Sequence, residues 1–162
     1  MPNLPSFRLS VPTGGALAEK IPIGADHAGF ALKERLKAEL EALGFEPVDV
    51  GTDSTESVDY PDYAKLVASQ VGTGAVGRGV LTCGTGLGMS YTANRFAGVR
   101  AAIAWTPEIA ELSRRHNDAN ILVLPARFLE EDQGVEILRR WLEVPFDGGR
   151  HQRRVAKIEA DK

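Results

Sequence analysis

The stretch Leu81-Thr82-Cys83-Gly84-Thr85-Gly86-Leu87-Gly88-Met89-Ser90 joins an apolar strand to a glycine-rich turn and the start of a helix. Its three glycines allow positive φ angles that turn successive N–H groups inward, and the helix adds its positive N-terminal end. The segment therefore predicts an anion-binding loop. We expect this loop to lower the pKa of Cys83 from ~8.5 toward neutrality, so that the thiolate can act as a base or nucleophile. From this segment alone, a buried cysteine beside glycines that serve only the turn is an equal alternative.

Composition limits the class of protein. The chain has 162 residues, 43% of them apolar and 25% charged, which predicts one domain with an ordinary core. We interpret residues 1–20, rich in proline and glycine, as a loosely packed extension and residues 21–162 as the domain. A single cysteine excludes an internal disulfide, and no signal peptide or membrane-length apolar run is evident. We therefore expect a cytoplasmic protein that does not enter a membrane.

The charge is unevenly distributed. A formal net charge of −3 argues against bulk binding of nucleic acid. Basic side chains nevertheless gather near the C-terminus, which predicts a local anion site or, alternatively, a solvated basic tail. They are Arg150, His151, Arg153, Arg154 and Lys157.

Apolar runs alternate with amphipathic segments along the chain. The predicted strands are 21–24, 45–50, 78–83, 99–104 and 120–124, and the predicted helices are 30–43, 61–71, 86–96, 106–115 and 130–142. This alternation indicates βαβ units, and hence a three-layer α/β sandwich with an open, doubly wound parallel sheet of about five strands. Pro22 is unexpected inside the first strand, because it removes a backbone donor.

Polar residues cluster near the predicted strand ends. Asp26 and His27 follow the first strand, Tyr60 lies in the segment after the second, and Cys83 ends the third. Open parallel sheets bind ligands at the carboxyl ends of their strands. We expect most of these residues to converge there, together with His116 and Asn117, which lie just before the fifth strand.

The spacing of the loop excludes three familiar phosphate sites. A dinucleotide fingerprint requires a glycine at position 89, and a phosphatase-type thiolate loop requires an arginine there, but the residue is Met89. A Walker loop requires a lysine before Ser90, which is again Met89. The remaining chemistry is proton transfer next to a carbonyl group, in which Cys83 moves the proton and the loop amides stabilise an enediolate.

Six motifs in order resemble the ribose-5-phosphate isomerase B family, which also contains the subunits of galactose-6-phosphate isomerase. The resemblance covers about residues 20–158, and an ordered set is far more specific than any single motif. The motifs are Gly24-Ala-Asp-His-Ala-Gly-Phe30, Asp59-Tyr-Pro61, Cys83-Gly-Thr-Gly-Leu-Gly88, Ala93-Asn-Arg-Phe-Ala-Gly-Val-Arg100, Ser113-Arg-Arg-His-Asn-Asp118 and Gly148-Gly-Arg-His-Gln-Arg-Arg154.

The resemblance implies a role for each matching residue. Cys83 is the proton-shuttling base, Thr85 assists proton movement between the substrate oxygens, and His116 opens the sugar ring. The loop residues Gly84, Gly86, Leu87 and Gly88 hold the enediolate, and Asp26, Tyr60 and Asn117 contact the substrate. The phosphate contacts are His27, Arg127, Arg150 and Arg154. The resemblance further implies no metal or cofactor, and a homodimer or dimer of dimers with sites between subunits.

Some of these residues have structural alternatives. Arg150 and Arg154 are four residues apart, so on a helix they face the same way and can clamp one phosphate. Asp26 could instead cap the following helix, Tyr60 could pack beside Pro61, and Arg127 could pair with a surface carboxylate. His27 and His116 could be satisfied by the backbone and by a helix dipole, respectively.

The function predicted from the sequence is interconversion of ribose 5-phosphate and ribulose 5-phosphate through an enediolate, with a phosphorylated sugar as the only partner besides a second copy. An isomerase of galactose 6-phosphate, allose 6-phosphate or a tetrulose phosphate is the alternative within this class. A phosphometabolite-binding module without turnover and a thiol switch are alternatives from other classes, although the thiol switch has no resolving cysteine.

Overall fold

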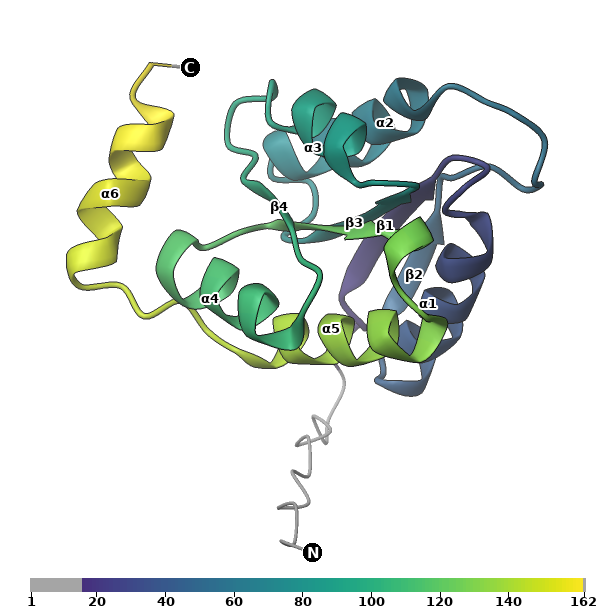
Figure 1. The fold of residues 1–162 in the computed structure, drawn as a ribbon. Coiled ribbons are helices and arrows are strands. Elements are labelled where there is room, and N and C mark those ends of the chain that lie inside the picture. Colours follow the sequence, from purple (N-terminus) through teal and green to yellow (C-terminus); the bar gives the residue numbers. More distant parts are fainter. Residues whose placement is uncertain (1–15, 162) are drawn as a thin grey trace, which may run out of the picture.

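The computed structural model describes residues 16–161, which form a three-layer sandwich around a five-stranded parallel sheet (Figure 1). The strand order is β2-β1-β3-β5-β4, and every neighbouring pair is parallel. The predicted fold class is therefore confirmed. The predicted extension, residues 1–20, lies mostly outside the described residues. The strands are β1 (Lys20–Ala25), β2 (Glu46–Asp49), β3 (Gly79–Cys83), β4 (Ala101–Ile103) and β5 (Ile121–Pro125).

Six helices accompany the sheet. They are α1 (Phe30–Ala42), α2 (Tyr60–Gly72), α3 (Leu87–Ala93), α4 (Pro107–Asn117), α5 (Glu131–Glu143) and α6 (Arg150–Glu159), and a short 3-10 turn spans Ala126–Phe128. The helices α1, α4 and α5 cover one face of the sheet, and α2 and α3 cover the other. The first five helices lie within a few residues of the predicted ranges. No helix was predicted after residue 142, and the only sign of α6 in the sequence was the four-residue spacing of Arg150 and Arg154.

The core is divided by the sheet into two apolar layers. Alternate residues of β3 point to opposite faces, so Val80 packs with α1 and α5 whereas Leu81 and Cys83 pack with α2 and α3. All five residues of β3 and of β5 are buried. Burial on both faces explains why these strands appear as nearly continuous apolar runs in the sequence.

Pro22 lies inside β1 rather than at its start. The carbonyls of Ile23 and Ala25 accept bonds from the chain that follows β2, so by alternation the backbone of Pro22 faces β3. The pairing of β1 with β3 begins only at Ile23 and Val80. The missing N–H of Pro22 therefore costs no ladder bond, which is why a proline is tolerated in this central strand.

The chain reverses its direction across the sheet between β1 and β3, because β2 lies on one side of β1 and β3 lies on the other. Such a switch point leaves an opening at the carboxyl ends of the two strands. There Asp26 follows β1 and Cys83 ends β3. No helix among the described residues has the length and apolar character of a membrane span.

Gly29 allows α1 to start directly against β3. A Cβ at this position would overlap Oγ1 and the carbonyl of Thr82, whose hydroxyl donates a 2.9 Å hydrogen bond to the Gly29 carbonyl. We predict that Gly29→Ala lowers the free energy of unfolding by about 2 to 3 kcal/mol, because the helix must move away from the strand. Urea denaturation measures the change. Gly77→Ala is the matched control, since its nearest atom lies 3.9 Å away, and equal stability of the two variants would contradict the expected overlap.

Candidate active site

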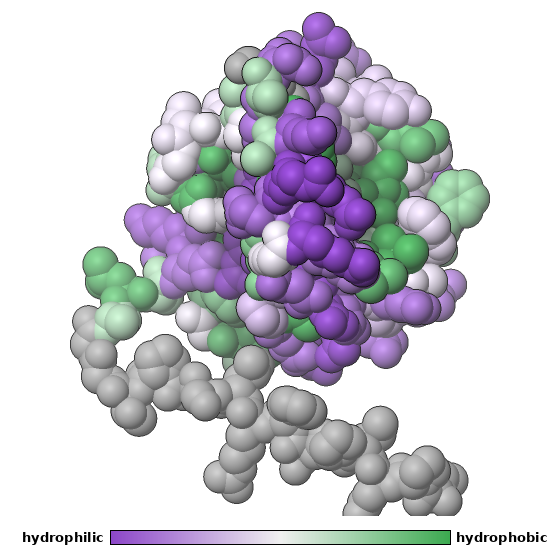
Figure 2. All heavy atoms as spheres, turned by 90° about the vertical axis from the view of Figure 1, so that its left-hand side faces the viewer, coloured by the Kyte–Doolittle hydropathy of each residue, from purple (hydrophilic) through white to green (hydrophobic). Residues whose placement is uncertain are grey.

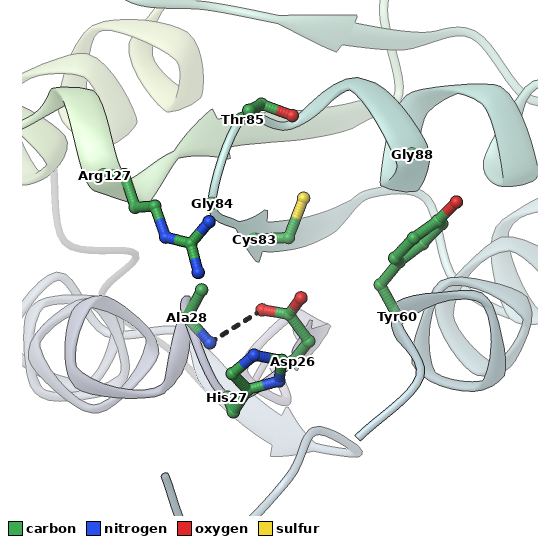
Figure 3. Close-up of a pocket in the computed structure, with 9 residues that line it drawn as sticks. All are labelled: Asp26, His27, Ala28, Tyr60, Cys83, Gly84, Thr85, Gly88 and Arg127. Carbon is green, nitrogen blue, oxygen red and sulfur yellow. Dashed lines mark hydrogen bonds between the residues drawn. The ribbon is translucent and has the colours of Figure 1, made fainter. Parts of the chain in front are cut away.

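A pocket of about 240 Å³ opens at the switch point (Figure 3). Its walls come from the segments that follow β1, β3 and β5, together with the start of α2. It therefore occupies the edge of the sheet at which ligand binding was expected. The lining residues are Asp26, His27, Ala28, Tyr60, Cys83, Gly84, Thr85, Gly88 and Arg127.

The Cys83 thiol points into this pocket. Figure 3 shows the sulfur directed toward the turn between Thr85 and Gly88, with Asp26 on its other side. The side chain is only 4% exposed, and its Sγ accepts a 3.2 Å hydrogen bond from the N–H of Gly86. Gly86 has a φ of 78°, so the turn needs a glycine to aim this N–H at the sulfur. The predicted loop of inward-facing amides is therefore present.

The expectation of a lowered thiol pKa is wrong. Burial raises the pKa of Cys83, and the negative charge of Asp26 raises it further. Hydrogen bonds from the backbone N–H groups of Met89, Gly86 and Thr85 act in the opposite direction without overcoming burial. The sequence shows the donors, but it does not show how little water reaches the end of a buried strand.

Asp26 connects the pocket to the start of α1. Its Oδ1 accepts the N–H groups of Ala28 and Gly29 at 3.0 and 3.1 Å. The residue that caps α1 is Gly29, so Asp26 holds the turn before the helix instead of capping it. The carboxyl group also lines the pocket below the thiol (Figure 3). The alternative that Asp26 caps α1 is therefore wrong, and its contact with a substrate stays a prediction.

His27 is held by the loop that precedes α2. Its Nδ1 accepts a 3.2 Å hydrogen bond from the N–H of Val58. A neutral imidazole with Nδ1 as acceptor carries its proton on Nε2, so His27 can offer one N–H donor to a ligand. Neither Val58 nor Ala28 was predicted from the sequence to belong to the site, although Ala28 lies within the first motif.

Two glycines make room for larger side chains of the pocket. The guanidinium of Arg127 lies across Gly84, where a Cβ would approach it to 3.1 Å. The backbone N–H of Arg127 donates a 3.0 Å hydrogen bond to the Gly84 carbonyl. The ring of Tyr60 lies against Gly88, and a Cβ there would collide with it. The glycines therefore serve close approach of Arg127 and Tyr60 as well as the turn itself.

Of the two predicted contacts Thr85 and Leu87, only Thr85 lines the pocket. Thr85 lines the pocket, and its Oγ1 accepts the N–H of Leu87 at 3.2 Å. Leu87 and Gly86 do not line it, and the Leu87 side chain is 47% exposed on α3. A direct contact of Leu87 with a small ligand remains a prediction.

Besides Gly86 and Leu87, four more predicted site residues lie outside the pocket. They are His116 and Asn117 at the end of α4, and Arg150 and Arg154 on α6. A helix that leads into a parallel strand ends at the amino edge of the sheet, which is opposite the pocket. In Figure 1, α4 and α6 lie on the left, whereas β1 and β3 end toward the right. The expectation that His116 and Asn117 converge on the rim with Cys83 is therefore wrong within one chain.

A second polar cluster surrounds His116. Its ring stacks on that of His151, with centroids 4.3 Å apart and an angle of 10° between the planes. Partial burial, followed by the charges of His116, Arg150 and Arg154, lowers the pKa of His151. His116, Asp147 and His151 each offer one donor atom within 4.8 Å of the others, so among the described residues this trio could hold a metal ion. The parallel rings would first have to rotate, because their lone pairs lie in separate planes.

The chain matches known proteins over most of its length. A family model described as Ribose/Galactose Isomerase matches residues 21–158. A curated relative from Escherichia coli strain K12, ribose-5-phosphate isomerase B, is 46% identical over 142 residues, which cover 88% of this chain and 95% of the relative.

Solved structures agree with this match. A ribose 5-phosphate isomerase from Thermotoga maritima superposes with a TM-score of 0.85 at 51% identity, covering 88% of this chain and 98% of that chain. Ribose-5-phosphate isomerase B from Mycoplasma genitalium with bound ribulose-5-phosphate gives 0.86 at 38% identity, covering 90% and 97%.

The raised pKa of Cys83 can be measured directly. We predict that alkylation of Cys83 by iodoacetamide has a pH midpoint above that of an ordinary exposed thiol. Asp26→Asn removes the negative charge that raises the pKa and keeps an oxygen for Ala28 and Gly29, so its midpoint moves to lower pH. Asp53→Asn, at an exposed position, is the control. A wild-type midpoint at or below the ordinary value would contradict this electrostatic picture.

Proposed function

The chain belongs to the ribose/galactose isomerase family, and we propose that it interconverts ribose 5-phosphate and ribulose 5-phosphate through an enediolate with Cys83 as the base. It is an aldose–ketose isomerase. The observation that carries the mechanism is the thiol of Cys83, which faces a polar pocket while backbone amides surround it. We place the reaction in the cytoplasm, where a single cysteine stays reduced.

The reaction consists of proton transfers within the substrate. The Cys83 thiolate removes the proton from C2 of the open-chain aldose, and the electron pair moves to give an enediolate. The thiol then returns a proton to C1, while one proton moves between O1 and O2 to leave a ketone at C2. Atoms and electrons balance within the sugar, so these steps need no external oxidant or reductant.

The loop after β3 is suited to the developing negative charge. Backbone N–H groups there already point toward Cys83, and amides fixed before the reaction need little rearrangement in the transition state. Thr85 presents its hydroxyl in the same pocket, where we propose that it relays the proton between the two oxygens. Asp26 and Tyr60 line the opposite wall and are the proposed contacts of the sugar hydroxyls.

The raised pKa of Cys83 changes both the fraction of thiolate and its strength as a base. A smaller fraction of the thiol is ionised at neutral pH, but the thiolate that forms is a stronger base. The thiolate fraction grows as the pH increases. We therefore propose that kcat/KM rises with pH through the neutral range until the Cys83 thiol is fully ionised.

One chain offers little positive charge for a phosphate. The pocket contains one arginine, Arg127, and the donor His27, whereas a phosphate ester carries about −1.5 to −2 charges at neutral pH. Arg150 and Arg154 form no ion pair with another described residue. Their charge is therefore available to a ligand.

We propose that a second copy of the chain completes the site, in a homodimer or a dimer of dimers. His116, Asn117, Arg150 and Arg154 of that copy would face the pocket of the first, where His116 opens the sugar ring and the arginines hold the phosphate. The sheet topology keeps His116 and Asn117 at the edge opposite Cys83, and Arg150 and Arg154 lie on α6, which packs against α4. Exposed apolar side chains on α3 and before α4 support an interface, since Tyr91 is 67% and Trp105 57% exposed.

Isotope exchange tests the role of Cys83. We predict that the wild-type chain incorporates deuterium from heavy water into ribose 5-phosphate, and that Cys83→Ala loses turnover by at least about a hundredfold while it still binds the sugar phosphate. Mass spectrometry and calorimetry measure the two effects. Wild-type-like turnover by Cys83→Ala would contradict the assignment.

Comparison of kcat/KM on five-carbon and six-carbon sugar phosphates tests the substrate, because an extra carbon moves the phosphate away from Arg127.

Complementation tests the shared site. Cys83→Ala and His116→Ala, co-expressed with different tags, form mixed dimers in which one site has both residues intact. Random pairing then restores about a quarter of wild-type activity, because half of the dimers are mixed and each has one intact site. If both residues acted within one chain, the mixture would show only the average of the two variants.

A further inference from the structure

We infer that His151 is a positioning residue that fixes the His116 imidazole in the orientation needed to open the sugar ring. The inference rests on the proposed function, which gives ring opening to His116. It assigns His151 no contact with the substrate. The juxtaposition that carries it is the stacking of the two rings at 4.3 Å with 10° between their planes.

The stack restricts the movement that His116 would otherwise have. Rotation of an imidazole about its last side-chain bond has a broad, shallow energy profile. His116 lies in the last turn of α4, and its ring forms no hydrogen bond with another described residue that would select one rotamer. A parallel ring at 4.3 Å blocks rotation out of the plane, so the nitrogen-bearing edge of His116 keeps one direction.

The segment before α6 places His151 beside His116. Asp147 is tied to α4, because its N–H donates to the Arg115 carbonyl at 2.9 Å and its Oδ1 accepts from Arg115 Nε at 3.2 Å. Gly148 and Gly149 then take φ angles of 64° and 54°, which reverse the chain into α6. The first turn of α6 follows, with the His151 N–H bonded to the Gly148 carbonyl at 3.0 Å.

The far end of α6 is anchored as well. Glu159 pairs with Arg100 at 2.9 Å and accepts the N–H of Gly98 at 3.1 Å. Between the ends, Val155 is the buried residue that packs the helix inward. Figure 2 shows the outer side of α6 as a hydrophilic band. The helix is therefore held at both ends, so the position of His151 is set by the fold and does not depend on a ligand.

Ring opening needs an imidazole in one orientation. The proton on O1 of ribose 5-phosphate must leave as the C1–O4 bond breaks, C1=O1 forms and O4 gains a proton. Each transfer requires hydrogen-bond distance and alignment, and a misplacement of about 1 Å can cost a large factor in rate. A ring that rotates freely spends most of its time misaligned, so loss of the stack should slow this step alone.

The two substrates differ in their need for this step. Ribose 5-phosphate is mainly a furanose and must open before C2 becomes acidic. Ribulose 5-phosphate forms no five-membered ring, because the oxygen on C5 that would close it carries the phosphate. Exchange of the C1 protons of ribulose 5-phosphate with heavy water therefore tests enediolate formation without ring opening.

The experiment compares His151→Ala and His151→Phe with Gln152→Ala, an exposed neighbour on α6 that serves as the control. Turnover of ribose 5-phosphate and deuterium incorporation at C1 of ribulose 5-phosphate are measured for each variant, together with its thermal stability and its mass in solution. We expect His151→Ala to lower kcat for ribose 5-phosphate about tenfold or more and to leave incorporation within about twofold of wild type. His151→Phe keeps an aromatic face for the stack and should recover most of kcat.

Three results would overturn the inference. An equal loss in both assays for His151→Ala and His151→Phe would mean that His151 contacts the substrate or supports assembly. Unchanged turnover of ribose 5-phosphate by His151→Ala would mean that the stack positions nothing. Absence of deuterium incorporation with the wild-type chain would refute the proposed isomerase mechanism itself and remove the premise.

Discussion

All five strands run in the same direction, so the residues that follow strands and the residues that precede them lie at opposite edges of the sheet. Cys83 ends β3, and Asp26 and Arg127 follow β1 and β5, so these three residues meet at one edge. His116 ends the helix before β5 and lies at the other. Side-chain rearrangement cannot bridge that separation. A site that uses both sets of residues must therefore be assembled from two copies of the chain, which makes the topology the basis of the proposed dimer.

The chemistry of the pocket depends on competition around one sulfur atom. Burial at the end of β3 and the charge of Asp26 favour the neutral thiol, and the amides of the following loop favour the thiolate. Asp26 is also bound by the backbone at the start of α1, which itself contacts Thr82 next to Cys83. The contacts that place α1 against β3 thus also set the distance between the carboxylate and the thiol. Stability and the strength of the base are therefore coupled at this point of the fold.

Local pattern was sufficient for most of the fold and for half of the site. Strands buried on both faces leave apolar runs in the sequence, and the glycines after Cys83 mark the turn, so the fold class and the pocket residues next to these strands could be predicted. The thiol pKa could not, because it depends on how deeply the strand end is buried. The placement of His116 depends on the direction of its helix relative to the sheet, and the His27 tautomer depends on Val58, 31 positions further along the chain. The tolerance of Pro22 likewise depends on where β3 begins to pair.

A crystal structure of the protein with ribulose 5-phosphate bound tests the central claim most directly. The account predicts that Cys83 Sγ lies about 3.5 Å from C1 or C2 of the sugar, in line with a reactive geometry. It also predicts that the phosphate lies between Arg127 of one copy and Arg150 and Arg154 of another. A sugar bound with both carbons beyond contact with the sulfur, or a phosphate held by residues of one chain alone, would contradict the account.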